Sequence, residues 1–139
     1  PVLPVTDDHV LPATRRLADD VARGVVLLMV AELDDEITGW VSLRRNRSEV
    51  ARRWATVERL QVRPERQGGG IGTELMRGVQ RRAQAIGAEH LRLVLRSGEG
   101  LEGFYAGLGW TEIGRHPGAL RLPDGDRDEV AMMLGLSVD

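Results

Sequence analysis

A glycine-rich turn stands between a strand-like run, Trp54 to Val62, and the longest helix-like run, Ile71 to Ile86. The turn reads Arg63-Pro-Glu-Arg-Gln-Gly-Gly-Gly-Ile-Gly72. Glycines allow backbone conformations that are closed to other residues, and the first amides of a helix have no intrahelical partner. Such a turn is an anion site, most often for phosphate. We therefore expect a protein that holds a phosphate-bearing cofactor.

The glycine spacing excludes two common phosphate-binding motifs. A dinucleotide fingerprint needs G-x-G-x-x-G, and counting from Gly68 or Gly70 places Thr73 or Leu75 at the last position. A Walker-type loop needs a Gly-Lys pair, and the chain contains no lysine. The pattern that remains is Gln67-x-x-Gly70-x-Gly72, which leaves a binder of some other phosphate compound as one alternative.

Two residues outside the turn are candidates for proton transfer. Strict alternation along the strand Trp54 to Val62 places Glu58 on one face with Thr56, Leu60 and Val62. A carboxylate beside apolar residues is costly unless compensated. Glu58 is therefore either one half of an ion pair with an arginine or a general base whose pKa is raised by partial burial. Tyr105, the only tyrosine, follows Phe104 and on composition alone is an aromatic that packs a short helix on the sheet.

The elements that position these residues follow from hydrophobic periodicity and from glycine and proline positions. The predicted helices cover Pro12–Arg23, Ile71–Ile86 and Glu99–Leu108. The predicted strands cover Val25–Glu32, Ile37–Leu43, Trp54–Val62, 89–95, Trp110–Gly114 and Glu129–Leu136. The segments between them, Arg44–Arg53 and His116–Asp128, are predicted as loops. Early hairpin strands pair antiparallel and the unit 54–95 needs a right-handed parallel crossover, so we predict an α/β fold with a mixed sheet.

Length, charge and composition narrow the class of protein. The 139 residues suit one domain, and a net charge of −2 argues against nucleic-acid or membrane-surface binding. No stretch is long enough to span a membrane, no signal peptide is visible, and there is no cysteine, so we expect a cytoplasmic protein. The three histidines show no metal spacing. A basic cluster is either a solvated loop or a site for an acceptor carboxylate or a cofactor phosphate: Arg44, Arg45, Arg47, Arg52 and Arg53.

The pattern at the glycine turn resembles the acetyl-CoA signature of the GNAT superfamily of N-acetyltransferases. Two further segments are similar to that family: Leu60-Gln-Val-Arg-Pro64 before the turn, and Gly103-Phe-Tyr-Ala-Gly-Leu-Gly-Trp110 later. The similarity spans about residues 25 to 136, with a finer similarity to the tabtoxin-resistance-like branch that acts on small molecules. Two features depart from the family. Only one helix precedes Val25, so an N-terminal strand and helix could be missing, and Ser97 stands where many members have Asn.

The resemblance implies one GNAT-like domain over residues 1–139, with two central parallel strands that splay apart around acetyl-CoA. Residues of the strand end, the turn and the following strand would hold this co-substrate: Leu60, Gln61, Val62, Gln67, Gly68, Gly69, Gly70, Ile71, Gly72, Thr73 and Ser97. Tyr105 would protonate the departing thiolate, and Glu58 would serve as the base.

The expected reaction is direct acetyl transfer to the amine of a small molecule, and the alternative is a CoA-binding sensor without turnover. No metal and no nucleic-acid partner are expected. The closing strands could pair across a homodimer.

Overall fold

The computed structural model describes residues 18–136 with the exception of 47, 49, 51 and 52. The first half of the predicted helix Pro12–Arg23 lies outside this range, and in the second half residues 18–22 are helical. Gly24 follows with a φ of +75°, as the predicted end at a glycine requires. Among the helices of the described residues, none has the length and apolar character that a membrane crossing needs.

Six strands form one mixed sheet, in the order β1-β2-β3-β4-β6-β5. The β3–β4 pair is parallel and the other four pairs are antiparallel, as the predicted mixed sheet requires. The elements are β1 (Val26–Leu33), β2 (Glu36–Arg45), β3 (Trp54–Val62), the short 3-10 helix η1 (Pro64–Arg66), α2 (Ile71–Ala85), β4 (His90–Arg96), α3 (Leu101–Gly107), β5 (Thr111–Leu122) and β6 (Gly125–Gly135).

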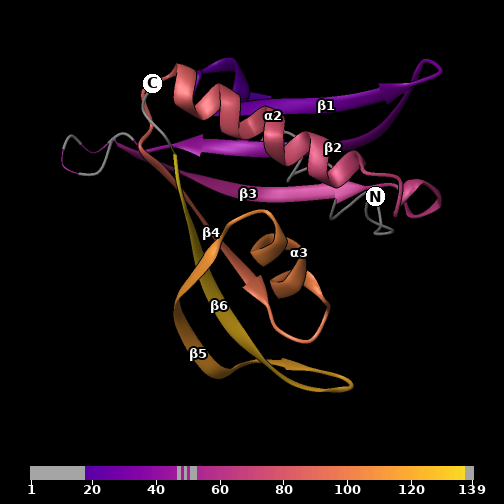
Figure 1. Cartoon of the computed structure of the whole chain (residues 1–139), viewed down its shortest axis with the longest axis vertical. Coiled ribbons are helices and arrows are strands. Elements are labelled where there is room, and N and C mark those ends of the chain that lie inside the picture. Colours follow the sequence, from indigo (N-terminus) through magenta and orange to yellow (C-terminus); the bar gives the residue numbers. More distant parts are fainter. Residues whose placement is uncertain (1–17, 47, 49, 51–52, 137–139) are drawn as a thin grey trace.

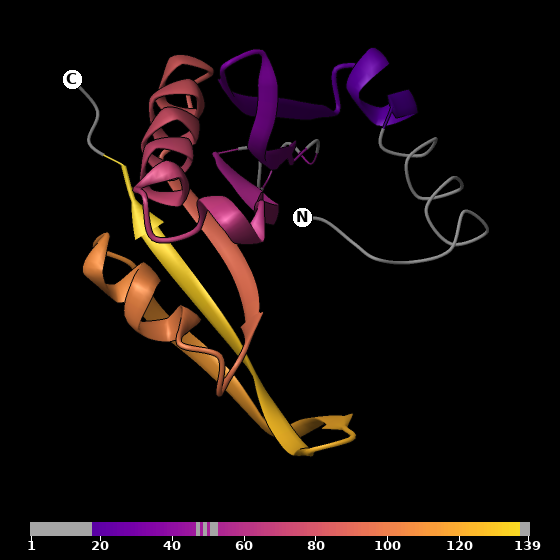
Figure 2. The same ribbon diagram turned by 90° about the vertical axis from the view of Figure 1, so that its right-hand side faces the viewer.

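Both α2 and α3 lie on one face of the sheet, which we call the helical face (Figures 1 and 2). The helical segment 18–22 lies on the other side, which we call the opposite face (Figure 2). On the helical face, the α2 stripe of Leu75, Val79 and Ala83 is buried against Val41 and Leu43 of β2, as its spacing predicts. The core therefore lies between α2, α3 and this face of the sheet.

The two parallel strands pair only at their beginnings. The register holds for Trp54↔His90, Ala55↔Leu91 and Thr56↔Arg92, and then β3 and β4 diverge (Figure 1). Beyond this point β4 stays paired with β6 as far as Arg96. In the described part of the chain, no strand pairs with residues 57–62 on the side toward β4. The predicted splay is confirmed, and it leaves the second half of β3 with a backbone edge free of strand pairing, although the Val62 carbonyl accepts a hydrogen bond from the Gln67 side chain.

The alternation predicted for β3 is wrong because the strand contains a β-bulge. Ser42 of β2 pairs with Arg59 while Leu43 pairs with Val57, so Glu58 is an extra residue with no partner on β2. A bulge of one residue reverses the alternation beyond it. Val57 is buried in the core, Leu60 packs against that same core, and Glu58 is exposed. Glu58 therefore does not share a face with Leu60 and Val62.

The loop predicted over His116–Asp128 is also wrong, because this segment belongs to one long hairpin. β5 runs to Leu122, and β6 begins at Gly125. Pro117 and Gly118 lie where the register shifts between His116 and Leu120, and Pro123 lies in the turn between the two strands. β5 is an edge strand, where a proline without an N–H is tolerated.

Candidate functional site

The glycine turn leaves the start of α2 without a side-chain cap. Gly68 and Gly70 have φ values of +86° and +87°, which glycine adopts most easily. Gly70 is the N-cap residue of α2 and carries no side chain that could bond the first amides. A Cβ placed on either glycine would meet no atom within 4 Å. The turn therefore presents uncapped amides, and the positive end of the helix dipole, to open space.

The turn is fastened to the strands beside it. The Gln67 side-chain amide donates to the Val62 carbonyl at 3.1 Å, and the Arg63 backbone N–H donates to Thr38 at 2.8 Å. Gly39 of β2 allows the start of α2 to come close, because a Cβ there would lie 2.8 Å from the Gln61 carbonyl and 3.1 Å from a Leu75 methyl. The second half of β3 and the turn thus form one rigid unit beside the splayed gap.

α3 lies close to the first turn of α2. A Cβ built on Gly72 in the first turn of α2 would lie 3.4 Å from the Phe104 ring and 3.9 Å from a Leu60 methyl. The structure therefore brings together three segments that are distant in sequence. They are the end of β3, the first turn of α2, and the part of α3 that carries Phe104 and Tyr105.

Tyr105 is 6% exposed and packs edge-on against two aromatic rings. The ring centroids lie 5.0 Å from Phe104 and 5.7 Å from Trp110. Burial raises the pKa of Tyr105 to about 12, because the low-dielectric surroundings disfavour the tyrosinate. The packing role predicted from composition is confirmed, and the hydroxyl is a protonated donor at neutral pH.

Glu58 is held by an arginine on the opposite face of the sheet. The Arg44 Nε donates to Glu58 Oε1 at 2.8 Å, so the ion-pair interpretation is confirmed and the expected partial burial beside Leu60 is absent. The same guanidinium donates through Nη2 to Asp20 Oδ2 at 2.8 Å. The Arg44 hydrogen bond lowers the pKa of Asp20 below its ordinary value. Sequence reasoning missed Asp20, since nothing in its spacing links it to β2 or β3.

Arg44 lies in β2, not in a loop, and its guanidinium is occupied by two carboxylates of the chain. The arginines of the predicted basic cluster therefore do not act as one group in the structure. Arg45 ends β2 and Arg53 pairs with Glu89 at 3.5 Å, while Arg47 and Arg52 lie outside the described residues.

Ser97 is fastened to β6. Its hydroxyl accepts a hydrogen bond from the Asp128 backbone N–H at 2.8 Å, and its own N–H donates to the Asp128 carbonyl at 3.0 Å. These two hydrogen bonds connect the residue after β4 to β6, so Ser97 has a structural role. Whether its hydroxyl also contacts a cofactor stays a prediction.

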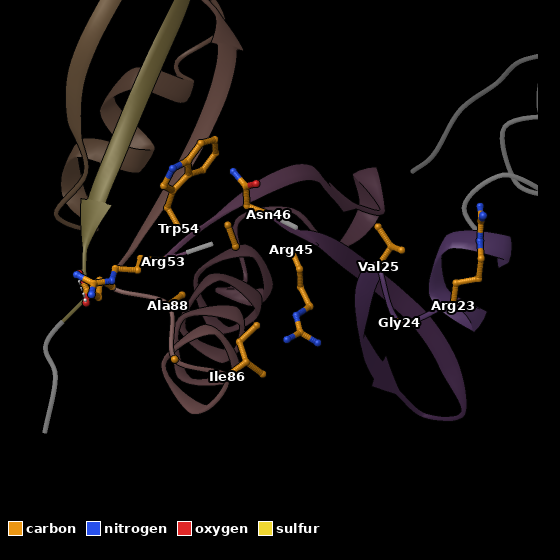
Figure 3. A pocket seen from close by; sticks show the side chains of 12 residues that line it. Arg23, Gly24, Val25, Arg45, Asn46, Arg53, Trp54, Ile86 and Ala88 are labelled. Atoms are coloured by element: carbon orange, nitrogen blue, oxygen red, sulfur yellow. Dashed lines mark ion pairs between the residues drawn. The ribbon is translucent and has the colours of Figure 1, made fainter. Parts of the chain in front are cut away.

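A cavity of about 740 Å³ lies near the other end of β3 and has polar walls (Figure 3). Trp54, Ile86 and Arg45 are among its lining residues. Arg45 and Arg53 of the predicted basic cluster line it, but none of the residues predicted for catalysis or for acetyl-CoA binding does. It is bordered by the beginning of β3 and the end of α2, so it faces neither the uncapped amides nor the splayed gap.

Comparison with known proteins identifies the family. The family model of an acetyltransferase (GNAT) domain matches residues 8–118. The fold is similar to that of a ribosomal-protein-S18-alanine N-acetyltransferase from Escherichia coli, with a TM-score of 0.78 and 19% identity over 99% of this chain and 81% of the other. It is also similar to a putative acetyltransferase from Salmonella typhimurium solved with its cofactor acetyl-CoA, with a TM-score of 0.77 and 23% identity over 89% and 73%.

Proposed function

Because the chain belongs to the GNAT family of acetyltransferases, we propose that it transfers an acetyl group from acetyl-CoA to the amine of a small-molecule acceptor. One observation carries this proposal. The uncapped amides at the start of α2 adjoin the free backbone edge of β3, where the parallel strands separate. This arrangement offers one site for a diphosphate and, next to it, a slot for an extended chain.

In this proposal the diphosphate of acetyl-CoA binds the amides of Gln67 to Thr73. The glycines at 68 and 70 let the phosphates approach the backbone, since no side chain stands over the turn. The amide-containing arm of the co-substrate then pairs with the free edge of Leu60 to Val62, as an added strand would. This pairing would replace the hydrogen bonds that β4 does not make with β3 beyond Thr56.

The acceptor approaches from the opposite face, because α2 and α3 cover the helical face beside the gap. Glu58 lies on that side, because it pairs with Arg44, and Arg44 also pairs with Asp20 of the segment 18–22. Its carboxylate would take a proton from the acceptor amine, directly or through a water. A backbone N–H near Gln61 or Val62 would stabilise the oxyanion that forms when the amine attacks the thioester.

Tyr105 would assist the departure of the CoA sulfur. With a pKa of about 12, its hydroxyl holds its proton more tightly than a thiol, whose pKa is about 8.5. Complete proton transfer to the thiolate is therefore uphill, and the main contribution of Tyr105 is a strong hydrogen bond to the developing negative charge. Most of the acceleration would come from holding amine and thioester in line.

A CoA-binding sensor on the same fold is the second candidate function. The observation that favours it is the ion pair of Glu58 with Arg44, which neutralises the only base proposed for the reaction. Fold alone does not establish turnover. A sensor would bind acetyl-CoA at the same turn and leave the thioester intact.

The test is thiol release from acetyl-CoA in the presence of a panel of primary amines, with mass spectrometry of the amine products. We expect stoichiometric thiol release and acetylated amine for at least one acceptor. Binding of acetyl-CoA without release across a broad panel supports the sensor. Absence of any stabilisation by acetyl-CoA in a thermal titration refutes both, because a ligand at 100 times its Kd stabilises by about 2.7 kcal/mol.

A further inference from the structure

We propose that Arg44 is a positioning residue, which holds one oxygen of Glu58 so that the other faces the acceptor amine. The inference rests on the proposed function, with Glu58 as the base. Nothing in the sequence pattern distinguishes Arg44 from Arg45 and Arg53 of the same basic cluster. The role of Arg44 follows from its contacts in the folded structure.

The first step of the argument is the local backbone. Glu58 is the extra residue of the β3 bulge, so it has no cross-strand partner on β2. The bulge lies two residues beyond Thr56, where the pairing with β4 ends. Bulges next to functional sites re-aim a side chain. Glu58 therefore lies where β3 and β4 begin to separate. Its backbone is paired neither with β2 nor with β4.

The second step is the fixation of the carboxylate. Arg44 donates through Nε to Oε1 of Glu58 at 2.8 Å, which leaves Oε2 outside this hydrogen bond. Charge-assisted bonds from the planar guanidinium restrict orientation as well as distance. The carboxylate therefore retains one oxygen for a proton of the acceptor or of a bridging water.

The third step is the fixation of Arg44 itself. Its Nη2 donates to Asp20 Oδ2 at 2.8 Å, and Asp20 belongs to the helical segment 18–22 on the opposite face. The guanidinium is thereby held between two elements, with a carboxylate on each side. Asp20, Arg44 and Glu58 form a continuous chain from the acceptor-side helix to the bulge.

The ion pairs of this chain are only partly buried, so we expect them to contribute little to folding. The side chains of Asp20, Arg44 and Glu58 are 21%, 38% and 35% exposed. Replacing Arg44 should leave the fold intact and free the Glu58 side chain to rotate. The replacement should then lower kcat and leave the Kd for acetyl-CoA and the Tm unchanged.

The experiment compares Arg44→Gln, Arg44→Lys and Glu58→Gln with the wild type, using the acceptor found in the amine panel. Arg77→Gln is the matched control, since Arg77 of α2 forms an exposed ion pair with Glu74 at 3.9 Å and does not contact the bulge. We expect Arg44→Gln to lower kcat roughly tenfold or more, with Arg44→Lys intermediate. The Kd for acetyl-CoA and the Tm should match those of the control.

Three results would overturn the inference while leaving the acetyltransferase in place. The first is wild-type kcat in Arg44→Gln. The second is a lower kcat that is accompanied by a lower Tm, with neither value restored in Arg44→Lys. The third is an undiminished effect of Arg44→Gln in the Glu58→Gln background, since two residues acting through one another are non-additive. A wild-type protein that releases no thiol with any amine refutes the proposed function itself, and the inference falls with it.

Discussion

Tyr105 can be studied without interference from other side chains. The sequence contains one tyrosine, no cysteine and no lysine, so Tyr105 is the only side chain whose ordinary pKa lies between those of histidine and arginine. It packs between Phe104 and Trp110, and in the proposed mechanism its hydroxyl is also the hydrogen-bond donor to the departing sulfur. Two predictions separate these properties.

Tyr105→Phe should reduce kcat by about tenfold to a thousandfold, because the departing sulfur loses its hydrogen-bond donor. The phenylalanine ring keeps the contacts with Phe104 and Trp110, so the Kd for acetyl-CoA should be unchanged. Steady-state kinetics and calorimetric binding measure the two quantities. Unaltered turnover in the variant would remove Tyr105 from the mechanism.

Alkaline pH should destabilise the wild type but not Tyr105→Phe. Between the ordinary pKa of 10.0 and the folded value of about 12, the unfolded chain loses its tyrosine proton while the folded chain keeps it. The free energy of unfolding is therefore full below pH 10 and decreases as the pH rises through that window, by up to about 2–3 kcal/mol. Tyrosinate absorbance and denaturant unfolding measure this, and ionisation of the native protein near pH 10 would disprove the burial effect.

Glu58 shows what sequence reasoning misses at this scale. Its identity as a carboxylate beside the predicted gap and the ion-pair alternative were available from the sequence. Its orientation was not, because the bulge that turns it away from Leu60 depends on the pairing of Ser42 and Leu43 with β3. Asp20, which fixes Arg44, likewise depends on the packing of an N-terminal segment that carries no motif.

At the scale of the element, a single glycine-to-alanine substitution can test the function of the glycine turn. Gly70→Ala should weaken acetyl-CoA binding at least about tenfold, because its Cβ would occupy the open space beside the turn where the phosphates are proposed to bind, and a non-glycine residue at a φ of +87° is strained. Gly87→Ala is the matched control. It has a φ of +88° and equally open surroundings, but lies beyond the other end of α2.

Both variants should lose a similar amount of stability from backbone strain, about 1 kcal/mol. Only Gly70→Ala should lose acetyl-CoA affinity, as measured by calorimetry. Equal affinities in the two variants would show that the turn does not hold the co-substrate.

The β5–β6 hairpin is tied to α3 by one arginine. Arg115 pairs with Glu102 of α3 at 3.0 Å, with Glu112 at 2.7 Å and with Asp128 at 2.8 Å. Hydrogen bonds from Arg115 lower the pKa of Glu112, and the Gly118 N–H together with Arg115 lowers that of Asp128. The stability from these carboxylates is present above their ordinary pKa values and is lost as the pH falls through the lowered values.

Arg115→Gln should therefore lower the Tm at neutral pH and reduce the further decrease in Tm between about pH 5 and pH 2. Arg121→Gln, on the same exposed strand, serves as the control. Thermal unfolding followed across this pH range measures both. A Tm profile of Arg115→Gln that runs parallel to the wild-type profile would contradict the assigned role of the three ion pairs.

At the scale of the whole molecule, most elements could be predicted from the sequence pattern, and the gap from the resemblance to the GNAT family. The β3–turn–α2 unit has strong local signals in its strand pattern, its glycines and the α2 stripe, and it fixes the parallel crossover. The outer parts of the β5–β6 hairpin could be predicted as strands, but its middle could not, because Pro117, Gly118 and Pro123 have the local signature of a loop. Pro117 and Gly118 lie in β5 at the sheet edge, and Pro123 lies in the turn between β5 and β6.

The central claim is that acetyl-CoA occupies the splayed gap, with its diphosphate on the amides of Gln67 to Thr73 and its thioester between β3 and β4. A crystal structure of the protein with acetyl-CoA tests this most directly. We predict diphosphate oxygens within hydrogen-bond distance of those amides and the arm paired with Leu60 to Val62. Acetyl-CoA bound in the cavity beside Trp54 and Arg45, with the glycine turn empty, would contradict the account.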